Sequence, residues 1–383
     1  MIPYSNLLFF YLAFLLLIPA FLLGIFEKPI KKYGLIATII MLFLFVGSSK
    51  LEMICLICFY LGQVILLKFY LYIRRFSKNI WHLRIILFLS LLPLILVKCN
   101  RFITVKTLGF IGISYVTFRT IEILIEIYDG LIKEISLIDY TYFILFFPTI
   151  LSGPIDRFRR FKFNIDEKIS RKTYIEDYFA VGLKKVLLGA LYKFVIATFI
   201  SNLWMNKIPR VHTCSNILNY MYSYSLYLFF DFAGYSLMAI GIGYILGVKV
   251  PENFNRPFIS KDIKEFWNRW HMSLSFWFRD FIYTRFVMNS MRKNRFKNRY
   301  TASYIGFFIT MLVMGIWHGV YIHYLIYGVY EGILLAGTDY FQKNSKFYKR
   351  NKKKKWYKYV SVFVTFNLVC FGLLIFSGYL YNK

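Results

Sequence analysis

The chain has 383 residues, of which 58% are hydrophobic and 17% charged, and its formal net charge is +29 at pH 7. Soluble domains contain about 45–50% apolar residues, so the composition excludes an ordinary soluble protein and predicts a polytopic membrane protein. The apolar runs are continuous rather than alternating, which favours membrane helices over strands. Lys and Arg lie in the gaps between these runs, as in cytoplasmic loops, so the charge does not indicate nucleic acid binding.

Several apolar segments approach the length of about 20 residues that a membrane helix needs. We therefore expect an all-α multi-pass membrane protein with about ten or eleven transmembrane helices. The longest segment, 216–247, predicts either one tilted helix or a helix with a break. In chain order the candidate segments are 7–26, 33–49, 51–67, 85–97, 108–127, 139–154, 179–203, 216–247, 301–319, 320–338 and 359–380.

The basic gaps predict the topology. The positive-inside rule places all of them in the cytoplasm, which puts the N-terminus outside the cell. Three apolar segments lie between Arg84 and Arg157, so one of them must not cross. Segment 108–127 is the candidate, because it carries Arg119, Glu122 and Glu126, and charges at membrane depth must face protein or water. The gaps are Lys28–Lys32, Lys68–Arg84, Arg157–Lys172, Lys249–Arg299 and Lys343–Lys358.

Residues 266–280, FWNRWHMSLSFWFRD, gather polar groups among aromatic ones. Read as one helix, the spacing places Asn268, His271, Ser275 and Arg279 on one face. A stripe of hydrogen-bonding groups suits the wall of a cavity, whereas a helix lying on the membrane surface usually carries lysines. An interfacial amphipathic helix remains the alternative.

A second histidine, His318, lies in the apolar segment that ends in GIWHG. An ionisable group at such a position is a functional candidate, and a packing histidine is the alternative. Gly315 and Gly319 permit close helix approach or a local break. Two histidines near a membrane suggest acid–base work near neutral pH. We assign no catalytic role to the remaining histidines, which are His82, His212 and His323.

Other kinds of site find little support in the sequence. No HExxH or clustered Cys/His spacing indicates a metal site, and no Walker A or GxGxxG loop indicates a nucleotide site. Asp231 lies in the apolar run FFDFAGYS and needs a partner. We expect it either to form a salt bridge with an Arg or to orient a histidine.

Four motifs in order carry a family resemblance: FPTILSGPIDRFRRF, FFDFAGYSLMAIGIGYILG, PENFNRPFISKDIKEFWNRWHMSLSFWFRDFIY and MGIWHG. Together they resemble the membrane-bound O-acyltransferases, and within that superfamily the teichoic-acid D-alanyl transferases of Gram-positive bacteria. The resemblance runs from Ile111 to Tyr330 and is firmest from Phe147 to Gly319.

The resemblance implies a single integral-membrane domain, 1–383, with an outer ring of helices around shorter tilted central helices. It implies N-terminal transmembrane helices over 1–100, a catalytic core over 111–340, a basic cytoplasmic loop over 341–358 and a C-terminal helix over 359–383. The two family histidines correspond to His271 and His318.

The resemblance also implies the substrates. D-alanine would arrive as a thioester on the phosphopantetheine arm of an acidic cytoplasmic carrier protein, and no cofactor would be bound permanently. The acceptor would be a hydroxyl reached from outside, on the way to lipoteichoic acid, with other membrane proteins of the D-alanylation system as partners in the cell membrane.

Further residues receive expected roles. Asn268 would fix the tautomer of His271 or donate to the thioester carbonyl, and Trp267, Trp270 and Trp317 would shape the passage and exclude water. Lys249–Arg299 holds twelve basic and four acidic residues, an excess that would steer an acidic carrier. We expect its docking at Val287 and Met288, with Arg292 and Lys293 as charge partners; site-shaping roles are also expected for Ser275 and Asp231.

Two alternative functions remain open. One is the O-acetylation of an exported cell-surface polysaccharide, which would use the same histidines with another donor. The other, from a different class, is a transporter or flippase, against which the absence of an internal repeat and of a nucleotide site argues.

Overall fold

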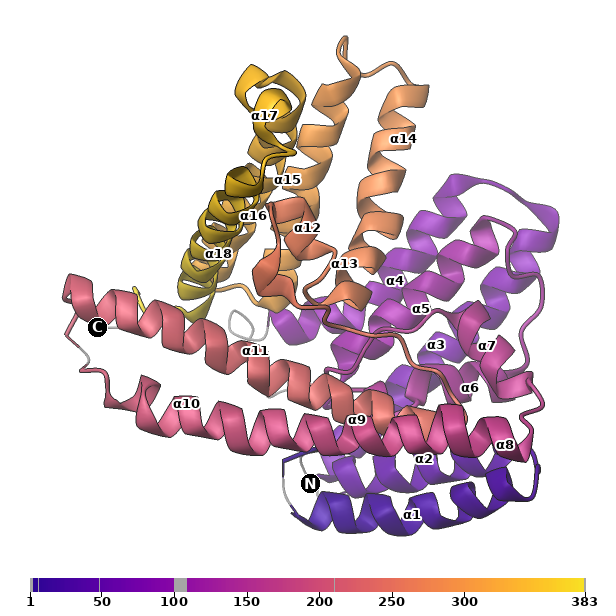
Figure 1. The fold of residues 1–383 in the computed structure, drawn as a ribbon. Coiled ribbons are helices and arrows are strands. Elements are labelled where there is room, and N and C mark those ends of the chain that lie inside the picture. Colours follow the sequence, from indigo (N-terminus) through magenta and orange to yellow (C-terminus); the bar gives the residue numbers. More distant parts are fainter. Residues whose placement is uncertain (1–2, 6, 48, 100–108, 210, 382–383) are drawn as a thin grey trace. The chain divides into compact units, whose positions relative to one another are not determined.

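The computed structural model describes residues 3–381 except 6, 48, 100–108 and 210, and this part of the chain contains helices and no strands (Figure 1). The predicted all-α fold is confirmed. Within the described residues, seven helices are long and apolar enough to cross a membrane. They are α1 (Leu7–Ile25), α3 (Lys50–Phe76), α4 (Ile80–Lys98), the helical run Arg171–Lys207, α11 (Cys214–Ile245), the helix over Tyr300–His318 within α15 (Arg299–His318), and α18 (Lys355–Ser377).

The run Arg171–Lys207 contains π-helical and 3₁₀ turns, and its parts are α8 (Arg171–Thr173), η2 (Tyr174–Ala180), α9 (Val181–Ala190), η3 (Leu191–Ala197), α10 (Thr198–Leu203) and η4 (Met205–Lys207). Segment 216–247, for which a break was one expectation, forms the single unbroken helix α11. The other apolar helices are shorter or carry more polar residues, namely α2 (Lys31–Val46), α5 (Ile113–Tyr128), α6 (Leu137–Leu145) with η1 (Phe147–Thr149), and α16 (Ile322–Asn344).

The chain divides into two compact units. Unit 1 comprises residues 1–189 and 235–251, and unit 2 comprises 190–234 and 252–383. Both predicted catalytic histidines belong to unit 2.

In unit 1, helix α5 is buried along almost its whole length, including every residue from Tyr115 to Ile127. This agrees with the expectation that its charges face protein. The Arg119 guanidinium donates to the carbonyl oxygens of Phe143 at 2.9 Å and of Thr149 at 2.8 Å. The predicted segment starts at Leu108, which lies outside the described residues, so the crossing pattern there stays a prediction.

The two carboxylates of α5 hold the arginine-rich segment that follows η1. Arg157 lies 3.3 Å from Glu122, whose other oxygen accepts from the Phe158 amide at 2.9 Å. Arg159 lies 3.1 Å from Glu126. These arginines, at the N-terminal end of α7 (Phe158–Asp166), thus form ion pairs with two buried carboxylates.

In unit 2, α15 and α16 form a close hairpin, and α18 packs against α16 (Figure 1). Glycines permit the close approach, because a Cβ added at Gly315 would lie 2.4 Å from the Tyr324 carbonyl oxygen. A Cβ added at Gly328 would lie 2.6 Å from the Met311 oxygen. The expected helix approach at Gly315 is therefore present. A break follows at Gly319, so His318 ends α15.

Short helices fill the chain between α11 and α15. They carry most of the motif residues singled out in the sequence. They are η5 (Pro257–Ile259), α12 (Ile263–Trp267), α13 (Met272–Phe278), the π-helical η6 (Arg279–Tyr283) and α14 (Thr284–Arg292), and α17 (Lys346–Asn351) joins α16 to α18.

Candidate active site

The motif FWNRWHMSLSFWFRD is not one helix. Helix α12 ends at Trp267, a turn follows, and α13 begins at Met272, with His271 in the left-handed conformation at φ 42°. The prediction of one continuous helix with a polar stripe was therefore wrong at this point. The reason is tertiary: the carbonyl oxygen of Asn253 accepts from the Met272 amide at 2.9 Å and anchors the start of α13.

The side chain of Asn253 also holds the imidazole. Its Oδ1 lies 3.1 Å from His271 Nδ1, and the same oxygen accepts from the Ser273 amide at 3.3 Å and the Ser273 hydroxyl at 2.9 Å. A backbone amide can only donate, so the Asn253 atom at this point must be the acceptor oxygen. His271 Nδ1 therefore carries a proton, and the neutral ring keeps the lone pair on Nε2.

The surroundings of His271 favour the neutral ring. The side chain is only 4% exposed, and the Phe232 ring packs edge-on with the centroids 4.8 Å apart. Burial first, and the nearby His318 imidazole second, lower the pKa of His271, which lies in a turn outside the seven candidate spans. A neutral imidazole with its Nε2 lone pair is the form that accepts a proton from a hydroxyl.

His318 lies at the end of α15 in an aromatic setting. Its ring centroid is 4.6 Å from that of Trp317 and 4.8 Å from that of Phe376 on α18. The His318 imidazole is the second cause, after burial, of the lowered pKa of His271, although 47 positions separate the two histidines in the sequence. The sequence placed them together only through the family resemblance.

The three tryptophans differ in their contacts. The Trp267 indole donates to the buried carboxylate of Glu331 on α16 at 3.1 Å. Trp270 belongs to the hydrophobic core, because it packs in an aromatic cluster with Phe254 and Phe266. Trp317 contacts His318 directly.

A cavity of about 250 Å³ lies in unit 2 beside these helices. The sequence predicted that Asn268, His271, Ser275 and Arg279 line a cavity. Asn268, Ser275 and Arg279 do line this one, but neither His271 nor His318 does. Asn268 does not hold the His271 Nδ1, since Asn253 does, so that expected role for Asn268 was wrong. The lining residues are Lys264, Trp267, Asn268, Ser275, Phe276, Phe278, Arg279, Tyr283, Phe307, Thr310, Met311, Met314 and Leu335.

Asp231 of α11 forms an ion pair with Lys193 of η3. The expectation of an arginine or histidine partner was wrong. Lys193 lies inside the apolar segment 179–203, so two opposite charges within apolar runs satisfy each other. Asp231 thus has a structural partner in unit 2.

The residues expected to dock a carrier lie on and just after α14. Met288 is 57% exposed and Met291 51%, whereas Val287 is half-buried and packs on α15 at Gly306. Arg292 and Lys293 are exposed beside them. The exposed apolar pair is therefore Met288 and Met291, and Met291 was missed in the sequence.

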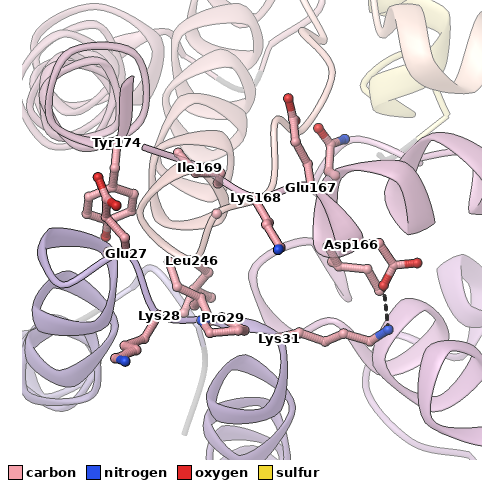
Figure 2. Close-up of a pocket in the computed structure, with 15 residues that line it drawn as sticks. Glu27, Lys28, Pro29, Lys31, Asp166, Glu167, Lys168, Ile169, Tyr174 and Leu246 are labelled. Atoms are coloured by element: carbon pink, nitrogen blue, oxygen red, sulfur yellow. Dashed lines mark hydrogen bonds and ion pairs between the residues drawn. The ribbon is translucent and has the colours of Figure 1, made fainter. Parts of the chain in front are cut away.

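A separate cavity of about 170 Å³ in unit 1 has the character of an ion-pair site (Figure 2). Lys31 Nζ lies 2.6 Å from Asp166 and 2.6 Å from Asp139. The lining carries as many acidic as basic side chains and includes no histidine, so it offers no acid–base centre. The charged lining residues are Glu27, Lys28, Lys31, Asp166, Glu167 and Lys168.

Comparison with known proteins decides the family. The pattern of the membrane-bound O-acyltransferase family matches residues 50–381, a wider range than the motifs in the sequence suggested. The chain belongs to this family. It is an acyltransferase, and the transporter alternative is thereby set aside.

Individual relatives of this membrane-bound O-acyltransferase extend the comparison. The chain is 43% identical over 390 residues to a protein of Bacillus subtilis (strain 168) named teichoic acid D-alanyltransferase, covering 99% of this chain and 98% of the relative. A protein of the same name from Streptococcus thermophilus is 39% identical over 396 residues, covering 99% and 95%. A "Probable alginate O-acetylase" of Pseudomonas aeruginosa is 36% identical over 270 residues, covering 70% and 48%.

Two further residues of this acyltransferase were not predicted from the sequence. Asn253 stands in PENFNRPF, 18 positions before His271, and no local spacing connects the two. Glu331 lies in the apolar segment 320–338 and is only 1% exposed. The rule that flagged Asp231, an acid inside an apolar run, would have found Glu331 as well.

Proposed function

We propose that this acyltransferase transfers D-alanine from the phosphopantetheine thioester of an acidic cytoplasmic carrier protein to a hydroxyl acceptor across the membrane, for D-alanylation of lipoteichoic acid. Two relatives named teichoic acid D-alanyltransferase match 99% of this chain, and this supports the choice of acyl group. The observation that carries the chemistry is the buried His271 with Nδ1 fixed on Asn253.

The reaction follows from that tautomer. The acceptor hydroxyl oxygen attacks the thioester carbonyl carbon, and Nε2 of His271 takes the hydroxyl proton. An ester C–O bond forms, the C–S bond breaks, and the leaving thiolate receives the proton. The thioester is already activated, so no nucleotide is consumed at this step. In this proposal His318 orients the acceptor or returns the proton to sulfur.

The passage of the donor is part of the proposal. The cavity beside α12 and α13 has apolar walls from Phe276, Phe307 and Met311, with Lys264 and Arg279 also lining it. Such a lining suits a slender, uncharged pantetheine arm that carries a phosphate at one end. Trp267 closes part of this wall and would help to keep water from the thioester.

The alternative donor is an acetyl group. The alginate O-acetylases support it, since they share the family, but they match only part of this chain and about half of their own length. The nature of the transferred acyl group therefore separates the two functions.

The test is a bacterial strain that carries His271→Gln or His318→Ala in place of the wild-type chain. We expect loss of D-alanine ester from the cell wall with normal membrane levels of the protein. His212→Gln is the matched control, because His212 is exposed and far from this chemistry in the chain. Wild-type D-alanine ester in both variant strains would overturn the proposal, and loss of O-acetyl groups instead would establish the alternative.

A further inference from the structure

A groove in unit 2 lies apart from the residues of the proposed reaction. It runs between α16 and α18, is bordered by α17 and the chain just before α12, and has a volume of about 520 Å³. Its lining includes the apolar Ile333, Val360 and Val364 and the basic Lys261, Lys352 and Lys358.

The walls of the groove are apolar and open. Ile333 is 59% exposed, Val360 49% and Val364 47%, and α18 is one of the candidate membrane spans. A Cβ added at Gly337 would meet no atom within 4 Å, so the groove is open at the middle of α16. In a membrane protein, apolar side chains that face outward from such helices contact hydrocarbon chains.

The lining of the groove is also basic. Lys261, Lys352 and Lys358 line it, against the single acidic lining residue Asp262. That carboxylate already accepts from the Glu265 amide at 2.8 Å and from Gln342 Nε2 at 2.9 Å. The adjoining residues 343–358 include nine Lys and Arg and no Asp or Glu. An occupant that matches this lining has apolar chains and a negative head.

We propose that the groove binds one anionic phospholipid. Its acyl chains would lie along Ile333, Val360 and Val364, and its phosphate would lie among the three lysines. Basic residues next to a membrane helix attract anionic lipid heads, and the apolar walls then select a lipid over a free anion. The proposal concerns a binding site and does not depend on the acyl group that the enzyme transfers.

The first test measures lipid binding to the full-length protein purified in detergent. Native mass spectrometry with added phosphatidylglycerol should show one retained lipid, and phosphatidylcholine should be retained more weakly. The triple variant Lys261→Gln, Lys352→Gln, Lys358→Gln should weaken binding by about fivefold for each lysine removed. The matched control removes the same charge outside the groove, with Lys353→Gln, Lys354→Gln and Lys355→Gln, and should bind as the wild type does.

The second test fills the groove without touching a charge. Gly337→Leu should project into open space, leave folding intact by size-exclusion profile, and abolish retention of phosphatidylglycerol. Gly62→Leu on α3 is the matched control, because a Cβ there also meets no atom within 4 Å. This control should leave binding unchanged.

Three results would each overturn the proposal. Equal weakening by both lysine triples would mean diffuse attraction to a basic surface rather than a site. Equal retention of phosphatidylcholine would mean that charge plays no part. Displacement of the lipid by inorganic phosphate at millimolar concentration would mean that the lysines bind a free anion and the groove contributes nothing.

Discussion

Oδ1 of Asn253 lies 3.1 Å from Nδ1 of His271, and the same oxygen accepts the Ser273 amide. The two residues are 18 positions apart within the same segment of unit 2, Glu252–Lys383, and Asn253 lies before α12 whereas His271 lies after it. One side chain thus fixes both the start of helix α13 and the tautomer of the imidazole. The start of α13 and the His271 imidazole thus share one partner, Asn253. The left-handed backbone at His271 and the orientation of its ring therefore depend on the same side chain.

The substitution Asn253→Ala tests whether the Asn253 side chain supports catalysis by orienting the His271 imidazole. We expect acyl transfer to fall about 100-fold, since the base loses its orienting acceptor. Asn253→Asp keeps an acceptor and should retain more activity. The assay is transfer of the acyl group from the loaded carrier by the purified enzyme. Asn255→Ala is the matched control, because Asn255 is exposed and pairs with Arg269 through its backbone amide and carbonyl. Wild-type rates in Asn253→Ala would contradict the role of Asn253.

The pH dependence of the rate follows from the same pair. Burial lowers the pKa of His271 below its usual value of about 6.5. The ring therefore stays neutral as the pH falls from 7.5 to about 5.5, and we expect His271 to cause no loss of rate in this range. In Asn253→Asp the added carboxylate favours the charged ring and raises its pKa. The acid limb of the rate profile should then move to higher pH, and an unmoved limb would argue against contact between residue 253 and the base.

The Trp267–Glu331 hydrogen bond is a second buried polar pair. Trp267→Phe leaves the Glu331 carboxylate without this donor, at a cost of about 1–3 kcal/mol in stability. Glu331→Gln should cost less, because the amide oxygen still accepts from the indole. Thermal unfolding in detergent measures both. Trp81→Phe is the control, since Trp81 is 59% exposed. An equal midpoint for Trp267→Phe and Trp81→Phe would show that the bond contributes nothing.

Some features of this fold could be predicted from the sequence, because they depend on composition. Continuous apolar runs predicted the helices, and Glu122 and Glu126 predicted that α5 would be buried, since charges at membrane depth need protein or water around them. Predictions of this kind depend only on the residues within one segment and on the membrane around it.

Other features depend on contacts between distant segments. The spacing of Asn268, His271 and Ser275 fits one helix face, but the Asn253 backbone and side chain replace the helical bonds there and break the helix. The sequence predicted an arginine or histidine partner for Asp231, whereas its partner is Lys193, which lies inside another apolar run. Local periodicity cannot reveal either contact.

The hairpin of α15 and α16 yields a prediction about Gly315. Gly315→Ala places a methyl group against the Tyr324 carbonyl oxygen, so the helices must separate, at a cost of about 1–3 kcal/mol. Because His318 lies one turn further on, we expect activity to fall as well. Gly62→Ala on α3 has open space and should stabilise the protein slightly, by about 0.5–1 kcal/mol. The unfolding midpoint and the transfer rate, measured on the same preparations, check both expectations.

The exposed methionines of α14 give a prediction about carrier binding. Met288→Asp should weaken binding of the phosphopantetheinylated carrier protein about tenfold or more, since a charge would enter an apolar contact. Met288 is a better test than Val287, because Val287 also packs on Gly306 and its replacement would disturb α15. Phe163→Asp on α7 is the control, as Phe163 is 67% exposed outside this surface. Binding is measured by pull-down and by surface plasmon resonance.

The charges beside this surface should act on the rate of association. Arg292→Glu with Lys293→Glu should slow the association of an acidic carrier and reduce its dependence on salt, while the dissociation rate changes little. Met288→Asp should instead raise the dissociation rate, because it disrupts the contact itself. If both variants bind the carrier with wild-type rates, the docking surface lies elsewhere on the enzyme.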